Sequence, residues 1–218
     1  MSVHAVPAAL AQLRRLPGVS TARDLADAKP AFPVVSALRS VFPTGLPRGE
    51  VTEIVGPQAL SLALAAVARL SAEDHWAAAV GVGEPAVQAI ADYGVSLSRF
   101  ASVEVDARDW LRAVSILVES FSAIIVRPGF SLTPTEQARL RAKVRERSMS
   151  LLVVGSSRQP KGTADRTVSV SAPRWVGLAQ GAGMLSECAV TVDHGRERVQ
   201  LLLPGASGRA EERGIRLV

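Results

Sequence analysis

Short apolar runs alternate with longer, partly polar stretches through the middle of the chain. The runs are four to seven residues long, and they lie at 51–55, 76–82, 100–105, 123–126 and 151–154. Bounded by glycine, proline or charged residues, such runs are typical of buried strands. The stretches between them have the length and apolar spacing of helices, and they lie at 59–68, 85–93, 106–120 and 135–147. This alternation predicts an α/β fold with a mostly parallel, twisted sheet and helices on both faces.

The N-terminal part of the chain lacks this alternation. Residues 1–33 mix several prolines with short helical patches, and we predict that they form an arm that packs on the domain or on a partner. The predicted domain spans residues 34–203 and begins with a short helix over 34–42.

The C-terminal part is also different. Residues 156–183 are polar and contain several glycines and prolines, which predicts a mobile loop within the domain. Strands at 188–192 and 198–203, joined by a turn at His194 and Gly195, predict a C-terminal antiparallel hairpin. The glycines of residues 204–218 predict a flexible tail.

Composition narrows the class of protein. Of 218 residues, 48% are hydrophobic, which is typical of a folded chain and not of a disordered one. The net charge of +5 permits contact with nucleic acid without requiring it. The single cysteine, Cys188, excludes an internal disulfide and a cysteine-cluster metal site, and its apolar surroundings predict a core position. Without a signal peptide or a run long enough to span a bilayer, we expect a cytoplasmic protein that does not contact membranes.

The stretch from Gly45 to Ala63 carries the most specific chemical signal. A strand, a sharp turn and an apolar helix follow one another as they do around a phosphate loop, whose pattern is Gly-x-x-x-x-Gly-Lys-Ser/Thr. Gly56 supplies the first glycine of that pattern. The positions of the second glycine, the lysine and the hydroxyl residue hold Ser61, Leu62 and Ala63. Gly56 is therefore either part of a phosphate cradle or a tight strand-to-helix turn required by the fold, and the missing groups favour the turn.

A family resemblance extends this interpretation. Residues 45–57, Gly-Leu-Pro-Arg-Gly-Glu-Val-Thr-Glu-Ile-Val-Gly-Pro, resemble the approach to the phosphate loop of RecA-type recombinases. Over residues 34–203 the order of elements is also similar to a RecA core. Among RecA-like families, a short chain with altered nucleotide motifs and arginine as its main cation resembles the ImuA-prime type of mutasome accessory protein. The SulA cell-division inhibitors are a more distant RecA-like family.

The resemblance implies a RecA-like fold without ATPase chemistry. Leu62 stands where the lysine would neutralise phosphate, and Ala63 stands where a hydroxyl would hold magnesium. Arg127 replaces the aspartate that ends a RecA core strand. Val82 aligns with the glutamate that activates water, and Glu84 follows two residues later. We therefore expect that the protein is not an enzyme and uses no nucleotide or metal cofactor.

The resemblance also implies partners. An ImuA-prime protein acts in DNA-damage-induced translesion synthesis, where it binds a Y-family-like polymerase homologue (ImuB) and helps an error-prone C-family polymerase. RecA protomers dock an N-terminal strand on the sheet edge of a neighbour, and the matching acceptor here is the strand at 100–105 with the helix at 106–120. The predicted partner-binding side chains on these two elements are Val103, Val105, Trp110, Val114 and Leu117. Trp175, next to Arg174, is a further candidate contact.

Several alternatives remain open from the sequence. Trp110 is either a core anchor or a contact residue. The polar loop contains three basic residues, Arg158, Lys161 and Arg166. They either make a weak contact with single-stranded DNA or belong to a solvated loop. The helix at 135–147 interleaves its arginines with glutamates, which favours an ordinary solvent-facing helix. The competing functions are a single-stranded-DNA-binding RecA-like accessory protein and a SulA-like inhibitor of cell division.

Overall fold

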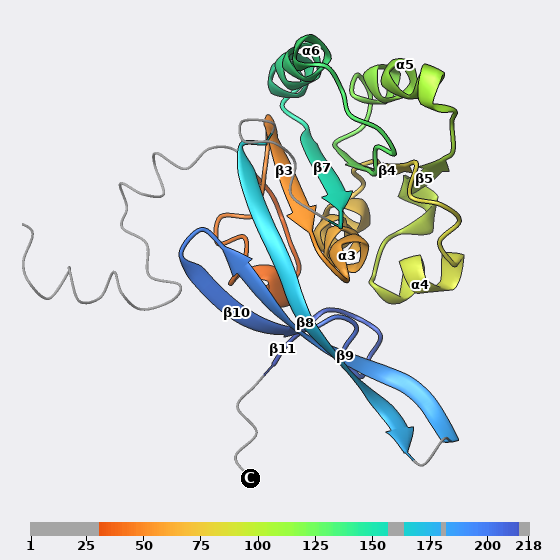
Figure 1. Cartoon of the computed structure of the whole chain (residues 1–218), viewed down its shortest axis with the longest axis vertical. Coiled ribbons are helices and arrows are strands. Elements are labelled where there is room, and N and C mark those ends of the chain that lie inside the picture. The colour runs from red at the N-terminus through yellow and green to blue at the C-terminus, as the bar shows by residue number, and fades with distance from the viewer. Residues whose placement is uncertain (1–30, 157–163, 180–181, 214–218) are drawn as a thin grey trace, which may run out of the picture.

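A nine-stranded mixed sheet forms the centre of the computed structural model, which describes residues 31–156, 164–179 and 182–213 (Figure 1). The strand order across the sheet is β11-β10-β9-β8-β3-β7-β6-β4-β5. These strands are β3 (Glu50–Val55), β4 (Ala77–Val80), β5 (Phe100–Val103), β6 (Ala123–Val126), β7 (Ser150–Gly155), β8 (Arg166–Ala179), β9 (Ala182–His194), β10 (Glu197–Leu202) and β11 (Glu211–Glu212). The helices are α3 (Ala59–Ala72), α4 (Val87–Asp92), α5 (Ala107–Leu117) and α6 (Pro134–Glu146).

Five neighbouring strands, β3, β7, β6, β4 and β5, are parallel throughout. Every residue of β4 and β6 is buried, which explains why these strands read as continuous apolar runs instead of alternating ones. The predicted parallel sheet is therefore confirmed. β5 lies at one end of the strand order, so it is an edge strand.

Helices cover both faces of this parallel half. Leu62 of α3 and Ile90 of α4 belong to the hydrophobic cluster on one face, which also includes Ile54 of β3. Trp110 of α5 and Val144 of α6 pack with strand residues on the other face. α3 is apolar on nearly every side and is almost wholly buried, as expected for a helix enclosed between the sheet and other elements.

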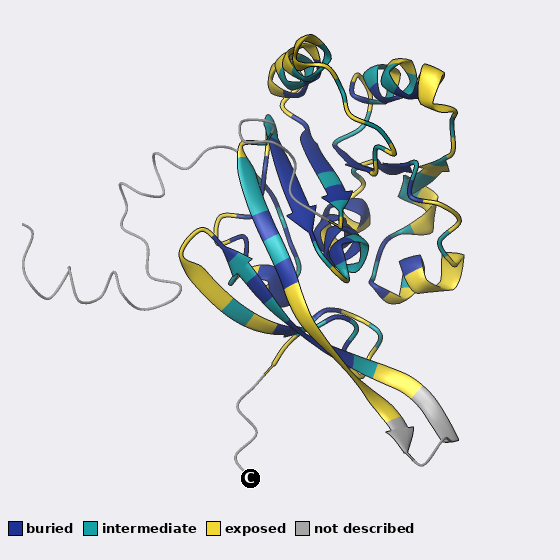
Figure 2. Cartoon of the chain, viewed as in Figure 1, coloured by how far each residue is buried: buried dark blue, intermediate teal, exposed yellow. Residues whose placement is uncertain are grey.

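The other half of the sheet corrects the loop prediction for residues 156–183. Residues 166–179 form β8, which pairs in parallel with β3 and in antiparallel fashion with β9. Beyond the sheet, β8 and β9 continue as a two-stranded arm (Figure 1) whose outer part is exposed (Figure 2). The predicted antiparallel pair is confirmed as β9 and β10, with a longer first strand.

Two further predictions at the ends of the domain are wrong. The helix expected over 34–42 is a single 3-10 turn at Ser36–Leu38, preceded by β1 (Ala31–Phe32), which pairs with β2 (Leu46–Pro47). The tail is folded as far as residue 213: Ala210 is buried, and β11 pairs with β10. The remaining tail residues, 214–218, and most of the arm, 1–30, lie outside the described residues. Within the described part of the chain, no helix is both long and apolar enough to cross a membrane.

Candidate functional site

The turn between β3 and α3 is built around Gly56. Its φ of +102° favours glycine, and a Cβ placed there would lie 2.0 Å from the carbonyl oxygen of Val170 on β8. The Gly56 amide donates to the carbonyl of Gly155 at the end of β7, at 2.9 Å. The close approach of β8 to the ends of β3 and β7 therefore requires a glycine here, independently of any ligand.

The first turn of α3 places its polar groups against one another. Gln58 precedes the helix in a left-handed conformation, with a φ of +63°. The Ser61 hydroxyl donates to the Gln58 side-chain oxygen at 2.6 Å. The position at which a phosphate loop needs a second glycine is thus occupied by a serine whose hydroxyl is already bonded within the turn.

The next two side chains of α3 face the core. Leu62 and Ala63 have no exposed surface and belong to the hydrophobic cluster between α3 and the sheet. Neither offers a cation or a hydroxyl to a ligand. At these positions the helix contributes packing to the fold and no polar group to the surface above it.

A cleft of about 730 Å³ lies over this turn, at the carboxyl ends of β3, β6 and β7. Arg127, directly after β6, lines the cleft and donates to the Val82 carbonyl at 3.2 Å. Serines line it from two sides, namely Ser131 and Ser156. Among the described lining residues there is no carboxylate, and Glu84 lies on the surface outside the cleft. The cleft has the position of a ligand site in an open α/β sheet but none of the acids that would hold a magnesium ion.

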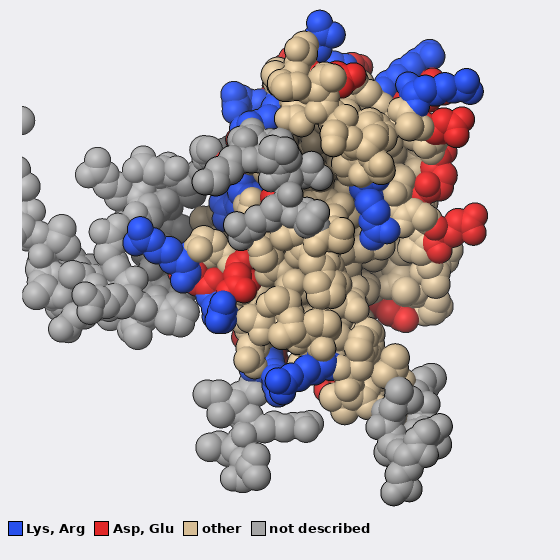
Figure 3. Space-filling view, in the orientation of Figure 1, with Lys and Arg blue, Asp and Glu red and all other residues tan. Residues whose placement is uncertain are grey.

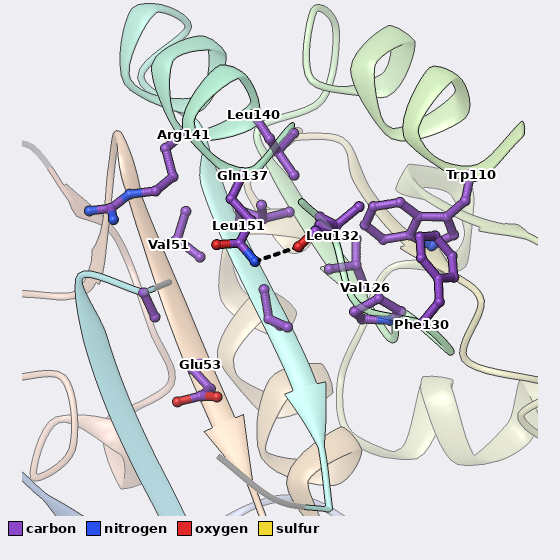
Figure 4. Close-up of a pocket in the computed structure, with 13 residues that line it drawn as sticks. Val51, Glu53, Trp110, Val126, Phe130, Leu132, Gln137, Leu140, Arg141 and Leu151 are labelled. Carbon is purple, nitrogen blue, oxygen red and sulfur yellow. Dashed lines mark hydrogen bonds between the residues drawn. The ribbon is translucent and has the colours of Figure 1, made fainter. Parts of the chain in front are cut away.

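A small apolar cavity of about 50 Å³ lies beneath α6 (Figure 4). Glu53 on β3 lines it, is 3% exposed, and accepts a hydrogen bond from the Thr167 hydroxyl at 3.0 Å. Sequence reasoning missed this buried carboxylate, although a glutamate within an apolar strand is a usable signal. Gln137 closes the cavity from α6 by donating to the Leu132 carbonyl at 3.0 Å. The wall is mostly apolar, and the cavity is too small for a nucleotide.

Trp110, also drawn in Figure 4, is a core residue. Its ring meets the ring of Phe130 edge-on, with centroids 5.5 Å apart, and only 2% of the residue is exposed. Val114, one turn later on α5, has no exposed surface. The prediction that these two side chains contact a partner is therefore wrong, because helical spacing directs them into the core.

Three of the predicted partner-binding side chains do gather at the β5 edge. Val103, Val105 and Leu117 are half-buried and pack on the outer margin of the core under α5. Ile116, which is not among the predicted contact residues, is 61% exposed on the same helix. This margin combines an open strand edge with an apolar border.

The remaining candidates lie elsewhere. Trp175 is 45% exposed on β8, separated from β5 by four strands, so it cannot share a contact with Val103. Arg166 begins β8 and is half-buried in register with Thr52, so it is not a free loop residue. Two other proposed DNA contacts, Arg158 and Lys161, lie outside the described residues. The structure therefore brings neither Trp175 nor Arg166 to the β5 edge.

Two titratable side chains, those of Cys188 and Tyr93, are buried in the hydrophobic cluster that contains α3. Cys188 has no exposed surface, which confirms its predicted core position, and burial raises the pKa of its thiol. Burial likewise raises the pKa of Tyr93, with a smaller opposing effect from a hydrogen bond with Ser61. Both shifts favour the neutral form of the side chain, as expected for groups packed in a core. No cluster of histidine, cysteine or acidic side chains in the described part of the chain could hold a metal ion.

Comparison with known proteins agrees with this architecture. No curated protein matches the sequence. Among solved structures, the crystal structure of the RadB recombinase superposes with a TM-score of 0.59 at 15% identity, and the match covers 82% of this chain and 97% of that one. The RecA-like fold expected from the sequence is therefore confirmed. A family model described as the MT3502 N-terminal domain matches residues 40–160, more than half of the chain, and the protein therefore belongs to that family.

Proposed function

We propose that the protein is a RecA-like adaptor that neither binds nor hydrolyses ATP. The observation that supports this most strongly is the burial of Leu62 and Ala63, whose positions correspond to the phosphate-binding lysine and the magnesium-binding hydroxyl. Phosphoryl transfer depends almost entirely on such positioned charges. Loss of one strong electrostatic donor costs roughly 3 kcal/mol of transition-state stabilisation. Here the lysine, the metal ligand and the acid at Arg127 are all replaced.

The proposed working surface is the open edge of β5. The Gly81 amide donates to the Val103 carbonyl at 3.1 Å, so Val103 directs its backbone groups toward β4. Because alternate residues of a parallel strand face opposite neighbours, Ser102 directs its N–H and C=O outward. No described strand pairs with that side. An added strand from a partner would satisfy these groups, and the apolar margin around Leu117 would receive its side chains.

The charge around this edge indicates what the partner segment carries. Acidic side chains line the side of the molecule where β5 lies (Figure 3), and Glu104, Asp106 and Asp109 are exposed there. Arg108 contacts the two aspartates at 3.8 and 3.3 Å, which leaves an acidic excess of two charges among these four residues. We therefore expect the docking segment to be extended, with apolar residues at alternate positions and basic residues among the others.

The identity of the partner rests on the resemblance to ImuA-prime proteins. We infer a cytoplasmic role in DNA-damage-induced translesion synthesis, with an ImuB-like Y-family polymerase homologue as the direct partner and an error-prone C-family polymerase in the same complex. The RecA-like fold is compatible with this role, because a fold that binds neighbours through a sheet edge keeps that ability after its nucleotide chemistry is lost.

A proline substitution at the edge tests the proposal. Ser102→Pro removes the outward N–H but leaves the bonds between β5 and β4, so the domain should remain folded. We expect affinity for the ImuB-like subunit, measured by calorimetry, to fall at least about tenfold, since one backbone hydrogen bond and the fit of the added strand are lost. The matched variant Ser102→Ala should bind as the unsubstituted chain does. Undiminished binding by a folded Ser102→Pro variant would refute docking at this edge.

A further inference from the structure

A second polar cleft lies at the amino ends of the parallel strands, whereas the β3–α3 turn lies at their carboxyl ends. Its volume is about 300 Å³. Segments far apart in the sequence form it: β1, the approaches to β3 and β4, and the segments that follow α5 and α6. The side chains that determine its chemistry are Phe32, Arg48, His75, Glu119, Ser122 and Arg147. The site discussed above uses none of them.

Two arginines give the cleft a positive charge. Arg48 is held in place, because its Nε donates to the Ser148 carbonyl at 3.0 Å and its guanidinium carbon lies 4.7 Å from the Phe32 ring centroid. Its terminal amino groups have no acceptor among the described residues. Arg147 has no side-chain hydrogen bond or ion pair within the described part of the chain. The one lining carboxylate, Glu119, already contacts the Lys143 ammonium at 3.3 Å. The lining residues therefore carry a net charge of +1, and the local charge is +2 when the neighbouring Lys143 is counted.

The opposite wall positions a histidine beside aromatic rings. The His75 ring meets Phe32 edge-on, with centroids 5.1 Å apart. Its Nδ1 lies 3.1 Å from the Ser122 hydroxyl, which fixes the ring and leaves Nε2 as its other polar atom. Phe121 lines the cleft beside Ser122. Hydrogen-bonding groups and apolar surface thus face the same space as the arginines.

We propose that this cleft binds a small phosphate monoester. A guanidinium matches the oxygens of a phosphate through paired hydrogen bonds, and two of them balance its dianionic charge. The volume lies at the lower limit for small-molecule sites and exceeds what inorganic phosphate fills, so it leaves room for an organic group against Phe32 and Phe121. The inference depends only on this cleft and is independent of the proposed adaptor role.

The proposal is tested by titrating the full-length chain with phenyl phosphate at constant ionic strength. Calorimetry measures the affinity, and amide NMR shifts locate the site. The expected shifts are at His75, Ser122 and Arg147, with inorganic phosphate binding more weakly at the same residues. Arg147→Gln should lower the affinity about tenfold, the size of one charge-assisted hydrogen bond, and Arg48→Gln should do the same. Arg139→Gln, on the exposed face of α6 outside the cleft, is the matched control and should change it less than about twofold.

Each other outcome overturns the proposal. Equal losses in Arg147→Gln and Arg139→Gln would show general attraction to a basic surface. Shifts confined to Gly56 and Ser61 would place the phosphate at the β3–α3 turn instead. Absence of any heat or shift at millimolar phenyl phosphate would show that the cleft binds no such ligand. The Arg147 side chain makes no hydrogen bond or ion pair with the described residues, so its substitution keeps the test valid even if Arg48→Gln unfolds the chain.

Discussion

Leu62 determines how the phosphate-loop region of this chain is interpreted. A lysine at the equivalent position of a phosphate loop must direct its ammonium to the ligand, whereas Leu62 has no exposed surface and packs between α3 and the sheet. Gly56, in the turn that precedes α3, has to be a glycine because a Cβ there would collide with the carbonyl oxygen of Val170, whether or not a ligand binds. The sequence predicts that this position offers no cation to a ligand, and the structure shows that its side chain is part of the core.

Reintroducing the lysine should damage the fold without creating a site. We expect Leu62→Lys to lower stability by several kcal/mol, because a charge would be buried without a partner. For a domain of this size that corresponds to a fall of about 10 °C in the melting temperature. Leu60→Lys, on the side of α3 that lines the cleft, should change it by only about 2 °C. Thermal unfolding of both variants by circular dichroism checks this, and equal stability of the two would contradict the buried role of Leu62.

At the scale of single elements, α6 begins with a capping box. Thr133 accepts from the Glu136 amide at 3.3 Å, and the Glu136 carboxylate accepts from the Thr133 amide at 2.8 Å. The Thr133 hydroxyl also donates to that carboxylate at 2.7 Å. Hydrogen bonds from the Thr133 side chain, and then from its backbone, hold the pKa of Glu136 below its ordinary value of 4.5.

This capping box makes the stability of α6 depend on pH. Because the folded-state pKa of Glu136 is lowered, its contribution is present above the unfolded-state pKa and is lost as pH falls through the folded-state pKa. We expect Thr133→Ala to cost about 1 kcal/mol at neutral pH and to raise the pKa of Glu136 toward 4.5. Urea unfolding and carboxyl NMR titration measure the two effects. An unchanged Glu136 pKa in the variant would show that the Thr133 hydroxyl does not control this group.

The elements also show where sequence reasoning succeeds. The strands and helices of the parallel half each bury a continuous or helically spaced set of apolar residues, so their patterns identified them. β8 was not predicted from the sequence, because its outer part is exposed on both faces and therefore has no alternating pattern. Pro173 and the positive φ of Ala172 mark a bulge in the pairing with β9, yet in sequence they resemble loop residues.

The candidate site was predictable to a similar extent. The replacements at Ser61, Leu62 and Ala63 could be read directly against a known motif. The burial of Trp110 could not, because an amphipathic helix has the same pattern whether its apolar face meets the core or a partner. The arginine cleft at the amino ends of the strands joins residues from five distant segments, and only the sheet topology brings them together.

At the scale of the whole molecule, two surfaces of a RecA-like scaffold are kept apart. The carboxyl ends of the parallel strands carry the cleft over the β3–α3 turn, while the edge of β5, with which no second described strand pairs, lies across the sheet from the β8–β9 arm. Binding at the edge requires no change at the cleft, so a chain that lost its nucleotide chemistry could keep its partner. This separation is the structural basis of the adaptor proposal.

The most direct test of that proposal is the melting temperature of the full-length chain with and without magnesium and ATP. A ligand at one hundred times its dissociation constant stabilises a folded protein by about 2.7 kcal/mol, which corresponds to a rise of about 5–10 °C for a domain of this size. We predict a change of less than about 1 °C at millimolar ATP, because Leu62 and Ala63 leave the phosphates without a cation or a metal ligand. A rise of several degrees that requires magnesium would show that the nucleotide site is intact and would contradict the account.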